Sequence, residues 1–227
     1  MAQIVKPESI DSRSRHSSSA ARPLLPQFLD SPIEIPGRVR WTRDQVEALK
    51  CSGFLELERR YEVIDGEIIE MSDNPPHRAE VVLLLAYLVS LFTALRACSQ
   101  ATFQVSKTDP ARNNPIPDVS VTMLEASAYF NRFPGPEDML FVGEVSDSSL
   151  AYDLSGKALL YSRAAIPEYW VLDIVNRRLI VHRTPTERGY TDIQVYSETE
   201  EAATHLFPDS KVRVSDLLPP ATEQTMN

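Results

Sequence analysis

The stretch Leu140-Phe141-Val142-Gly143-Glu144-Val145 is an apolar, strand-forming run that carries one acid near its end. Burying that carboxylate costs free energy unless a positive charge meets it. A second acid, Asp118, precedes the apolar run at residues 119–123, and Lys157 follows on a predicted short helix. Metal-dependent phosphodiesterases need two carboxylates that bind a divalent cation and a lysine that stabilises charge on the phosphate. The order of these residues therefore indicates such chemistry.

Helix and strand patterns surround these runs. Residues 41–49 predict a helix with Thr42 as its N-cap, and residues 61–71 predict a β-hairpin that turns at Asp65-Gly66. Residues 77–97 predict a long helix that is apolar on most sides. The other predicted elements are a strand at 101–106, a helical turn near 126, a helix at 153–165, and strands at 168–175, 179–184, 190–196 and 211–214. This pattern predicts a single α/β (α+β mixed) domain, a mixed β-sheet flanked by helices.

The composition is that of an ordinary globular protein. Its 227 residues are 43% hydrophobic and 24% charged, with a formal net charge of -9. This charge argues against a protein that coats nucleic acid through a general basic surface. It does not exclude a nuclease, because clustered carboxylates attract phosphate once a cation lies among them.

The two ends of the chain differ in composition from the rest. Residues 1–40 are rich in Ser, Arg and Pro and predict a disordered or loosely ordered tail, the domain spans residues 41–219, and residues 220–227 form a flexible C-terminus. The longest apolar stretch, at 81–92, is too short to cross a bilayer, so no membrane is expected. The two cysteines are far apart and outside any metal-binding spacing, which fits a reducing, cytoplasmic location.

Five segments in this order resemble the Uma-two-type restriction endonuclease family of the PD-(D/E)XK nuclease superfamily. They are the segments 61–68, Pro117-Asp118-Val119, Val142-Gly143-Glu144-Val145-Ser146, Asp153-Leu154-Ser155-Gly156-Lys157 and 166–171. The resemblance covers residues 41–219. It implies a restriction-endonuclease-like core, a divalent metal site and hydrolysis of phosphodiester bonds in DNA.

The resemblance assigns roles to particular residues. Asp118 matches the motif aspartate and Glu144 the motif glutamate, and with the carbonyl of Val145 they are expected to bind Mg²⁺ or Mn²⁺. The usual lysine position, two residues after the glutamate, is Ser146 here. Lys157 on the following helix is the expected replacement, because a long flexible amine can reach one phosphate from several backbone positions.

Five further side chains are auxiliary candidates. His77 matches a position where the family often has histidine, although a plain residue at the start of a helix is an equal reading. Either Glu67 or Glu80 is a candidate for an auxiliary acid, and spacing does not choose between them. Asp153 lies four residues before Lys157 and could orient it, whereas Tyr161 either contacts a phosphate or packs.

Several alternatives stay open at this point. In the loop after Glu144 the family usually has Ser-Pro-Ser-Thr, whereas residues 146–149 of this chain are Ser-Asp-Ser-Ser. Asp147 in this loop is either a turn residue or a further metal ligand, and the turn role is favoured because Asp and Ser are turn formers. The altered loop and the acidic charge also permit a catalytically inactive module that binds nucleic acid or a partner. A glycosidase is disfavoured, because aromatic content is 8%. A homodimer is open, since two cuts need two sites.

Overall fold

The computed structural model describes residues 39–71, 75–93, 96–106 and 111–220. The predicted tail at 1–40 lies outside these residues except for its last two positions. The predicted C-terminal segment at 220–227 lies outside them except for its first. Both therefore stay predictions.

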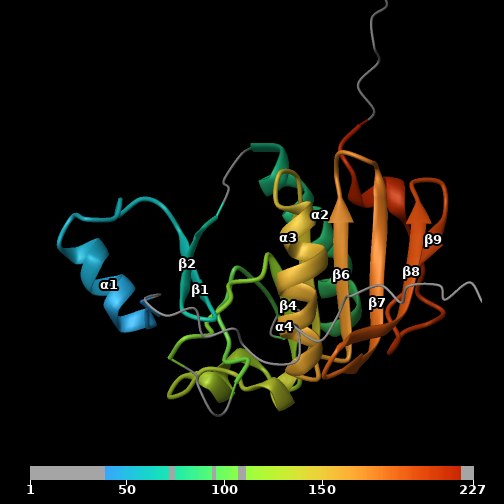
Figure 1. The fold of residues 1–227 in the computed structure, drawn as a ribbon. Helices are drawn as coiled ribbons and strands as arrows, with labels where there is room; N and C mark the ends of the chain where they lie inside the picture. Colours follow the sequence, from blue (N-terminus) through green and yellow to red (C-terminus); the bar gives the residue numbers. More distant parts are fainter. Residues whose placement is uncertain (1–38, 72–74, 94–95, 107–110, 221–227) are drawn as a thin grey trace, which may run out of the picture. The chain divides into compact units, whose positions relative to one another are not determined.

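Six strands form the central sheet in the order β3-β4-β5-β6-β7-β8 (Figure 1). They are β3 (Ala97–Ser99), β4 (Val119–Thr122), β5 (Met139–Ser146), β6 (Glu168–Asp173), β7 (Arg178–Thr186) and β8 (Gly189–Ser197). All neighbouring pairs are antiparallel except β5–β6, which is parallel. A parallel pair needs a long crossover connection, and here it is helical. The crossover consists of α3 (Leu150–Tyr152), the π-helical turn η3 (Asp153–Lys157) and α4 (Ala158–Arg163).

The remaining elements lie outside this sheet. They are α1 (Arg43–Cys51), the hairpin β1 (Tyr61–Ile64) and β2 (Glu67–Glu70), α2 (Pro75–Phe92), the 3₁₀ turns η1 (Ala126–Tyr129), η2 (Pro136–Asp138) and η4 (Val214–Leu217), and the small pair β9 (Glu201–Ala202) and β10 (Val212–Arg213). Thr42 caps α1 and shares a capping box with Gln45, as the sequence predicts for the cap. The hairpin turns at Asp65 and Gly66, whose φ angles are 49° and 75°.

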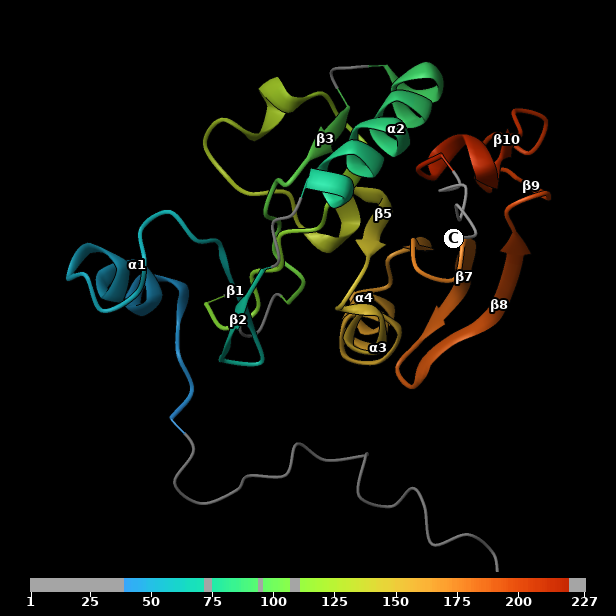
Figure 2. The ribbon, with the colours of Figure 1, turned by 90° about the horizontal axis from the view of Figure 1, so that it is seen from above.

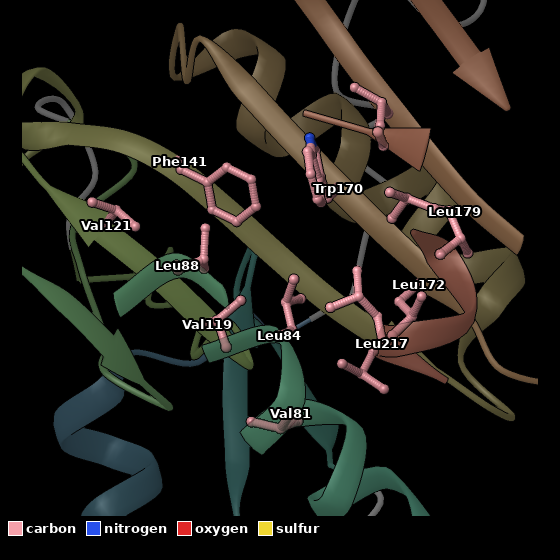
Figure 3. Packing of buried hydrophobic residues seen from close by; sticks show 14 of the residues in the cluster. Val81, Leu84, Leu88, Val119, Val121, Phe141, Trp170, Leu172, Leu179 and Leu217 are labelled. Atoms are coloured by element: carbon pink, nitrogen blue, oxygen red, sulfur yellow. The ribbon is translucent and has the colours of Figure 1, made fainter. Parts of the chain in front are cut away.

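The sheet separates two apolar clusters, because successive side chains of a strand point to opposite faces. On one face, Phe141 and Val145 of β5 pack with α2, and Figure 3 shows Leu84 and Leu88 of that helix among them. On the other face, Val142 packs with the crossover. Figure 2 shows α2 and the α3–α4 crossover on opposite sides of β5. Glu144 shares its face with Val142, so it points toward the crossover.

Gly143 of β5 faces α2 and lies close to Val119 of β4. An added methyl group at this position would lie 2.7 Å from Val119 Cγ2 and 3.2 Å from Leu84 Cδ2. We expect Gly143→Ala to lower the free energy of unfolding by about 1–3 kcal/mol through overpacking, measured by denaturant titration. In a Val119→Ala background, which removes the nearest atom, the cost should shrink. An equal cost in both backgrounds would contradict the contact.

Two sequence predictions about the segment after α2 are wrong. The helix predicted to reach residue 97 ends at Phe92, because Thr93 takes a left-handed φ of 73°, and residue 97 begins β3. No strand forms at 101–106. Phe103 and Val105 are buried in the crossover-side cluster, but their segment has no strand partner in the described part of the chain, and the Gln104 N–H binds the Pro134 carbonyl at 2.9 Å. The apolar pattern of this segment therefore reflects burial in the core and not pairing in a sheet.

Candidate active site

A cavity of about 60 Å³ lies where the end of β5, the start of α2, the hairpin and the crossover meet. The residues that line it are Glu62, Ile69, Met71, His77, Asp118, Glu144, Val145, Asp147, Ser148, Ser149, Tyr152, Asp153 and Lys157. A single water needs roughly 10–15 Å³ measured in this way, so the cavity has room for a small ion with some of its waters.

Asp118 lies directly before β4 and is 3% exposed. Its Oδ2 accepts a hydrogen bond from the Val145 N–H at 2.8 Å and lies 3.0 Å from His77 Nε2. Its Oδ1 is buried and has no hydrogen-bond partner among the described residues. A buried carboxylate oxygen without a partner carries a desolvation cost that a bound cation or water would remove.

Glu144, near the end of β5, is 2% exposed. Its Oε1 accepts hydrogen bonds from Lys157 Nζ at 3.0 Å and from the Tyr161 hydroxyl at 2.8 Å, whereas no described group donates to its Oε2. Burial raises the pKa of Glu144 well above its usual value; Lys157 opposes the shift and the charge of Asp118 adds to it. The two motif acids are therefore close enough to repel one another, and a shared cation would relieve that repulsion.

Lys157 ends the π-helical turn and is 5% exposed. Its Nζ lies 3.0 Å from Glu144 Oε1, 3.1 Å from Glu62 Oε2 and 3.9 Å from Asp153 Oδ1. Burial alone would lower the pKa of Lys157, but the charges of Glu144, Glu62 and Asp153 outweigh it and raise that pKa. The ammonium group therefore stays charged inside the site.

The crossover is fixed against β5 by Asp153. Its Oδ2 accepts hydrogen bonds from the Ser146 hydroxyl at 2.7 Å and the Ser149 hydroxyl at 2.6 Å, and its carbonyl accepts one from Tyr169 at 3.1 Å. Ser146 shares a strand face with Glu144. A small hydroxyl at this position lets the crossover come close, so Lys157 reaches Glu144 from the helix rather than from the strand.

Most of the predicted site residues meet at this place. His77, Asp118, Glu144, Val145, Asp153 and Lys157 line the cavity, and Tyr161 reaches it through Glu144. The two candidates for an auxiliary acid do not line it: Glu67 is exposed on β2, and Glu80 is buried on α2. Asp147 lines the cavity and is exposed. Its role as a turn residue, favoured over that of a metal ligand, stays a prediction.

Sequence reasoning missed Glu62, the acid that contacts Lys157 from the hairpin. It is 1% exposed, and its Oε1 accepts a hydrogen bond from the Ile116 N–H at 2.6 Å. Burial raises the pKa of Glu62, with the charge of Lys157 opposing it. The sequence did hold one signal for Glu62, because it is an acid inside the apolar strand segment Tyr61–Ile64. Its cross-strand partner is Ile69.

The donors around the cavity fit a magnesium-type ion. Among the described residues, no three His, Cys, Asp or Glu side chains form a metal-binding group by themselves. Mg²⁺, however, uses one or two carboxylates and keeps several waters. The N–H and C=O of one strand residue point to the same side of the strand. Because the Val145 N–H binds Asp118, the Val145 carbonyl also faces Asp118. The Ser146 carbonyl faces the other way, toward β6, and accepts a hydrogen bond from the Ile174 N–H at 3.0 Å. Asp118 Oδ1, Glu144 Oε2 and the Val145 carbonyl are the oxygens available to a cation.

Comparisons with known proteins agree with this fold. The chain is similar to a structure titled "putative nuclease belonging to DUF820 from Anabaena variabilis", with a TM-score of 0.55 and 17% identity, over 78% of this chain and 96% of that chain. At that identity the likeness shows the fold alone, and it confirms the predicted mixed-sheet class. No curated protein matches the chain in sequence. The family model described as "Uma2: Putative restriction endonuclease" matches residues 44–215, well over half of the chain. The predicted resemblance is therefore confirmed, and the chain belongs to the Uma2 restriction endonuclease family.

Proposed function

We propose that this protein is a Mg²⁺- or Mn²⁺-dependent endonuclease that hydrolyses phosphodiester bonds of DNA, with Asp118, Glu144 and Lys157 as its catalytic residues. The observation that carries the proposal is the buried, unpartnered Oδ1 of Asp118, in a cavity that it shares with Glu144 and a charged lysine. Membership of a nuclease family supports the reaction class.

The charges of the cavity support a cation. Besides the exposed Asp147, the cavity is lined by four buried carboxylates, those of Glu62, Asp118, Glu144 and Asp153, together with the buried ammonium group of Lys157. If all are ionised, these five groups sum to three negative charges. Such an excess in a buried site is costly unless the acids take up protons or a cation. A divalent ion would leave one negative charge and would let the acids stay ionised.

Each residue has a distinct part in this proposal. Asp118, Glu144 and the Val145 carbonyl hold the cation, which when bound polarises a phosphate oxygen and lowers the pKa of a water. Lys157 places its ammonium group beside the phosphate and stabilises the negative charge that develops there. Tyr161 fixes the orientation of Glu144 through its hydrogen bond to Oε1. His77 does the same for Asp118.

Replacing His77 tests that supporting contact. We expect His77→Ala to weaken Mn²⁺ binding by about 10- to 100-fold, because partners that orient a metal-binding carboxylate have effects of this size. Isothermal titration calorimetry with Mn²⁺ measures the change. His205→Ala is the matched control, since that side chain is exposed and its backbone N–H keeps its bond to Glu168. Equal affinities of the two variants would contradict the role of His77.

The activity itself is tested by cleavage of supercoiled plasmid DNA and of a labelled single-stranded oligonucleotide. Mg²⁺, Mn²⁺ and EDTA are compared with the purified chain. The proposal expects nicked or linear product with Mg²⁺ or Mn²⁺ and none with EDTA. Cleavage that persists in EDTA, or its absence with both ions, would refute the proposed reaction.

A second candidate is a catalytically inactive module that binds nucleic acid or a partner. It is favoured by the direct contacts of Lys157 with Glu62 and Glu144, which partly neutralise the site without a cation. Calorimetry separates the two candidates: an inert module has no Mn²⁺ site that disappears in Asp118→Asn, whereas the endonuclease has one.

We also propose that the protein is cytoplasmic. Cys51 and Cys98 are free thiols, which is consistent with a reducing, cytoplasmic location. No helix in the described ranges has both the length and the apolar character needed to cross a bilayer.

The homodimer expected from the need for two cuts is tested by light scattering during size-exclusion chromatography.

A further inference from the structure

The hairpin face that carries Glu62 extends beyond β1 and β2. Met71 donates its N–H to the Arg60 carbonyl at 3.0 Å, which continues the register in which Glu62 pairs with Ile69. Because side chains alternate along a strand, Arg60 lies on the same face as Glu62. Ile69 and Met71, their cross-strand neighbours, line the cavity. Arg60 itself does not line the cavity, but its cross-strand neighbour Met71 does, so Arg60 lies next to the cavity wall.

No acid among the described residues forms an ion pair with the guanidinium of Arg60. Its Nη1 and Nη2 are buried and lack hydrogen-bond partners in the described part of the chain. The adjacent Arg59, on the opposite face, pairs with Glu56 and Glu70. An unpaired guanidinium in a chain of net charge -9 is unusual, and a phosphate is the anion that its planar fork fits best.

An aromatic ring lies on the crossover side of the same cavity. Tyr152 is half-buried and lines the cavity, and its ring rests against the backbone of Gly156. A methyl group added at Gly156 would lie 2.7 Å from Tyr152 Cε2, so the ring position depends on the glycine. With Ile69 and Met71, this ring gives the carboxylate cavity an apolar wall.

We infer that this wall is a nucleotide subsite, in which Arg60 binds a backbone phosphate and Tyr152, with Ile69 and Met71, contacts the base next to the bond that is cut. The inference rests on the proposed function and adds a substrate class, an unpaired nucleic-acid strand. A base can lie against an aromatic ring when its face is exposed, and a duplex hides both faces. An unpaired strand also brings one phosphate backbone, not two, to an acidic protein.

The test measures binding of a DNA oligonucleotide that contains 2-aminopurine, whose fluorescence falls when the base stacks. Ca²⁺ is present, because it takes the same oxygen ligands in a looser geometry. We expect quenching and binding with the single strand and much weaker binding of the same oligonucleotide in a duplex. Tyr152→Leu should lose the quenching and bind about tenfold more weakly, and Arg60→Gln should also bind about tenfold more weakly.

Matched controls separate these effects from general damage. Arg59→Gln removes the same charge one residue away, and Tyr129→Leu removes a half-buried tyrosine that does not line the cavity. Neither should change binding by more than about twofold, the usual scale for a contact outside the site. Gly156→Ala keeps the tyrosine, favours the helix and displaces the ring, so it should reduce quenching even if Tyr152→Leu does not fold.

The results distinguish failure of this inference from failure of the proposed function. Duplex binding as tight as single-strand binding, or unchanged affinity in both Tyr152→Leu and Arg60→Gln, would overturn the subsite even if Mn²⁺-dependent cleavage is found. Tyr152-dependent binding of the single strand without cleavage in any metal would uphold the subsite and refute the nuclease reaction.

Discussion

Asp118→Asn and Glu144→Gln are each expected to lower the rate of Mn²⁺-dependent cleavage by about a thousandfold. Each change keeps the shape of the side chain and removes the negative charge that would hold the cation. A thousandfold loss corresponds to about 4 kcal/mol of transition-state stabilisation, within the range that a bound metal ion supplies. Initial rates on supercoiled plasmid, with Mn²⁺ varied, measure the effect and separate it from weaker metal binding.

The control for this pair is Glu67→Gln, an isosteric change at an exposed glutamate outside the cavity lining. It should cleave at the rate of the unchanged protein. Circular dichroism and thermal unfolding establish that each variant is folded. Retained cleavage in the folded double variant Asp118→Asn/Glu144→Gln would refute the assignment of the site.

Lys157→Met is expected to have the largest effect on stability as well as to lower cleavage. The ammonium group lies within 4 Å of Glu62, Glu144 and Asp153, and all three acids are at most 3% exposed on their side chains. Removing it leaves their charges buried without compensation. Breaking a buried ion pair in this way costs about 3–5 kcal/mol, so a marginally stable protein would lose much of its stability.

Denaturant titration of Lys157→Met measures that cost. Lys211→Met is the control, because Lys211 is exposed and should change stability by less than about 0.5 kcal/mol. Adding Mn²⁺ should restore part of the loss in Lys157→Met, since a bound cation replaces the missing positive charge. An unchanged free energy of unfolding would mean that the acids do not depend on the lysine.

Much of the fold follows from local pattern. The apolar runs predicted β4 and β5 to within two residues, and Asp65-Gly66 predicted the hairpin turn. Tyr169 and Trp170 lie in the predicted strand at 168–175, and both are fully buried. In these segments a strand or turn preference and tertiary burial demand the same conformation, so the sequence alone is enough.

The errors arise where tertiary contacts decide the outcome. The segment 101–106 is apolar because Phe103 and Val105 fill the core, and no local signal reports that it lacks a strand partner. Glu62 belongs to a hairpin whose position against the crossover depends on contacts distant in sequence, such as Ile116 N–H with Glu62 Oε1. The pattern of the hairpin predicts its turn but not which glutamate points into the site.

The contacts of the crossover could also be predicted only in part from the sequence. Spacing placed Asp153 and Lys157 on one helix face, and they do lie together, at 3.9 Å. The sequence did not indicate the π-helical turn between them, which widens the helix at this point. Nor did it indicate that Ser146, at the usual lysine position, would hold Asp153.

We propose that Asp118 and Glu144 bind one divalent cation beside Lys157. A crystal of the protein soaked in Mn²⁺ tests this binding, because manganese gives an anomalous scattering peak. We predict one peak within about 2.0–2.3 Å of Asp118 Oδ1 and of a Glu144 carboxylate oxygen, with the Val145 carbonyl as a third ligand. A well-ordered site without such a peak, or manganese bound only elsewhere, would contradict the account.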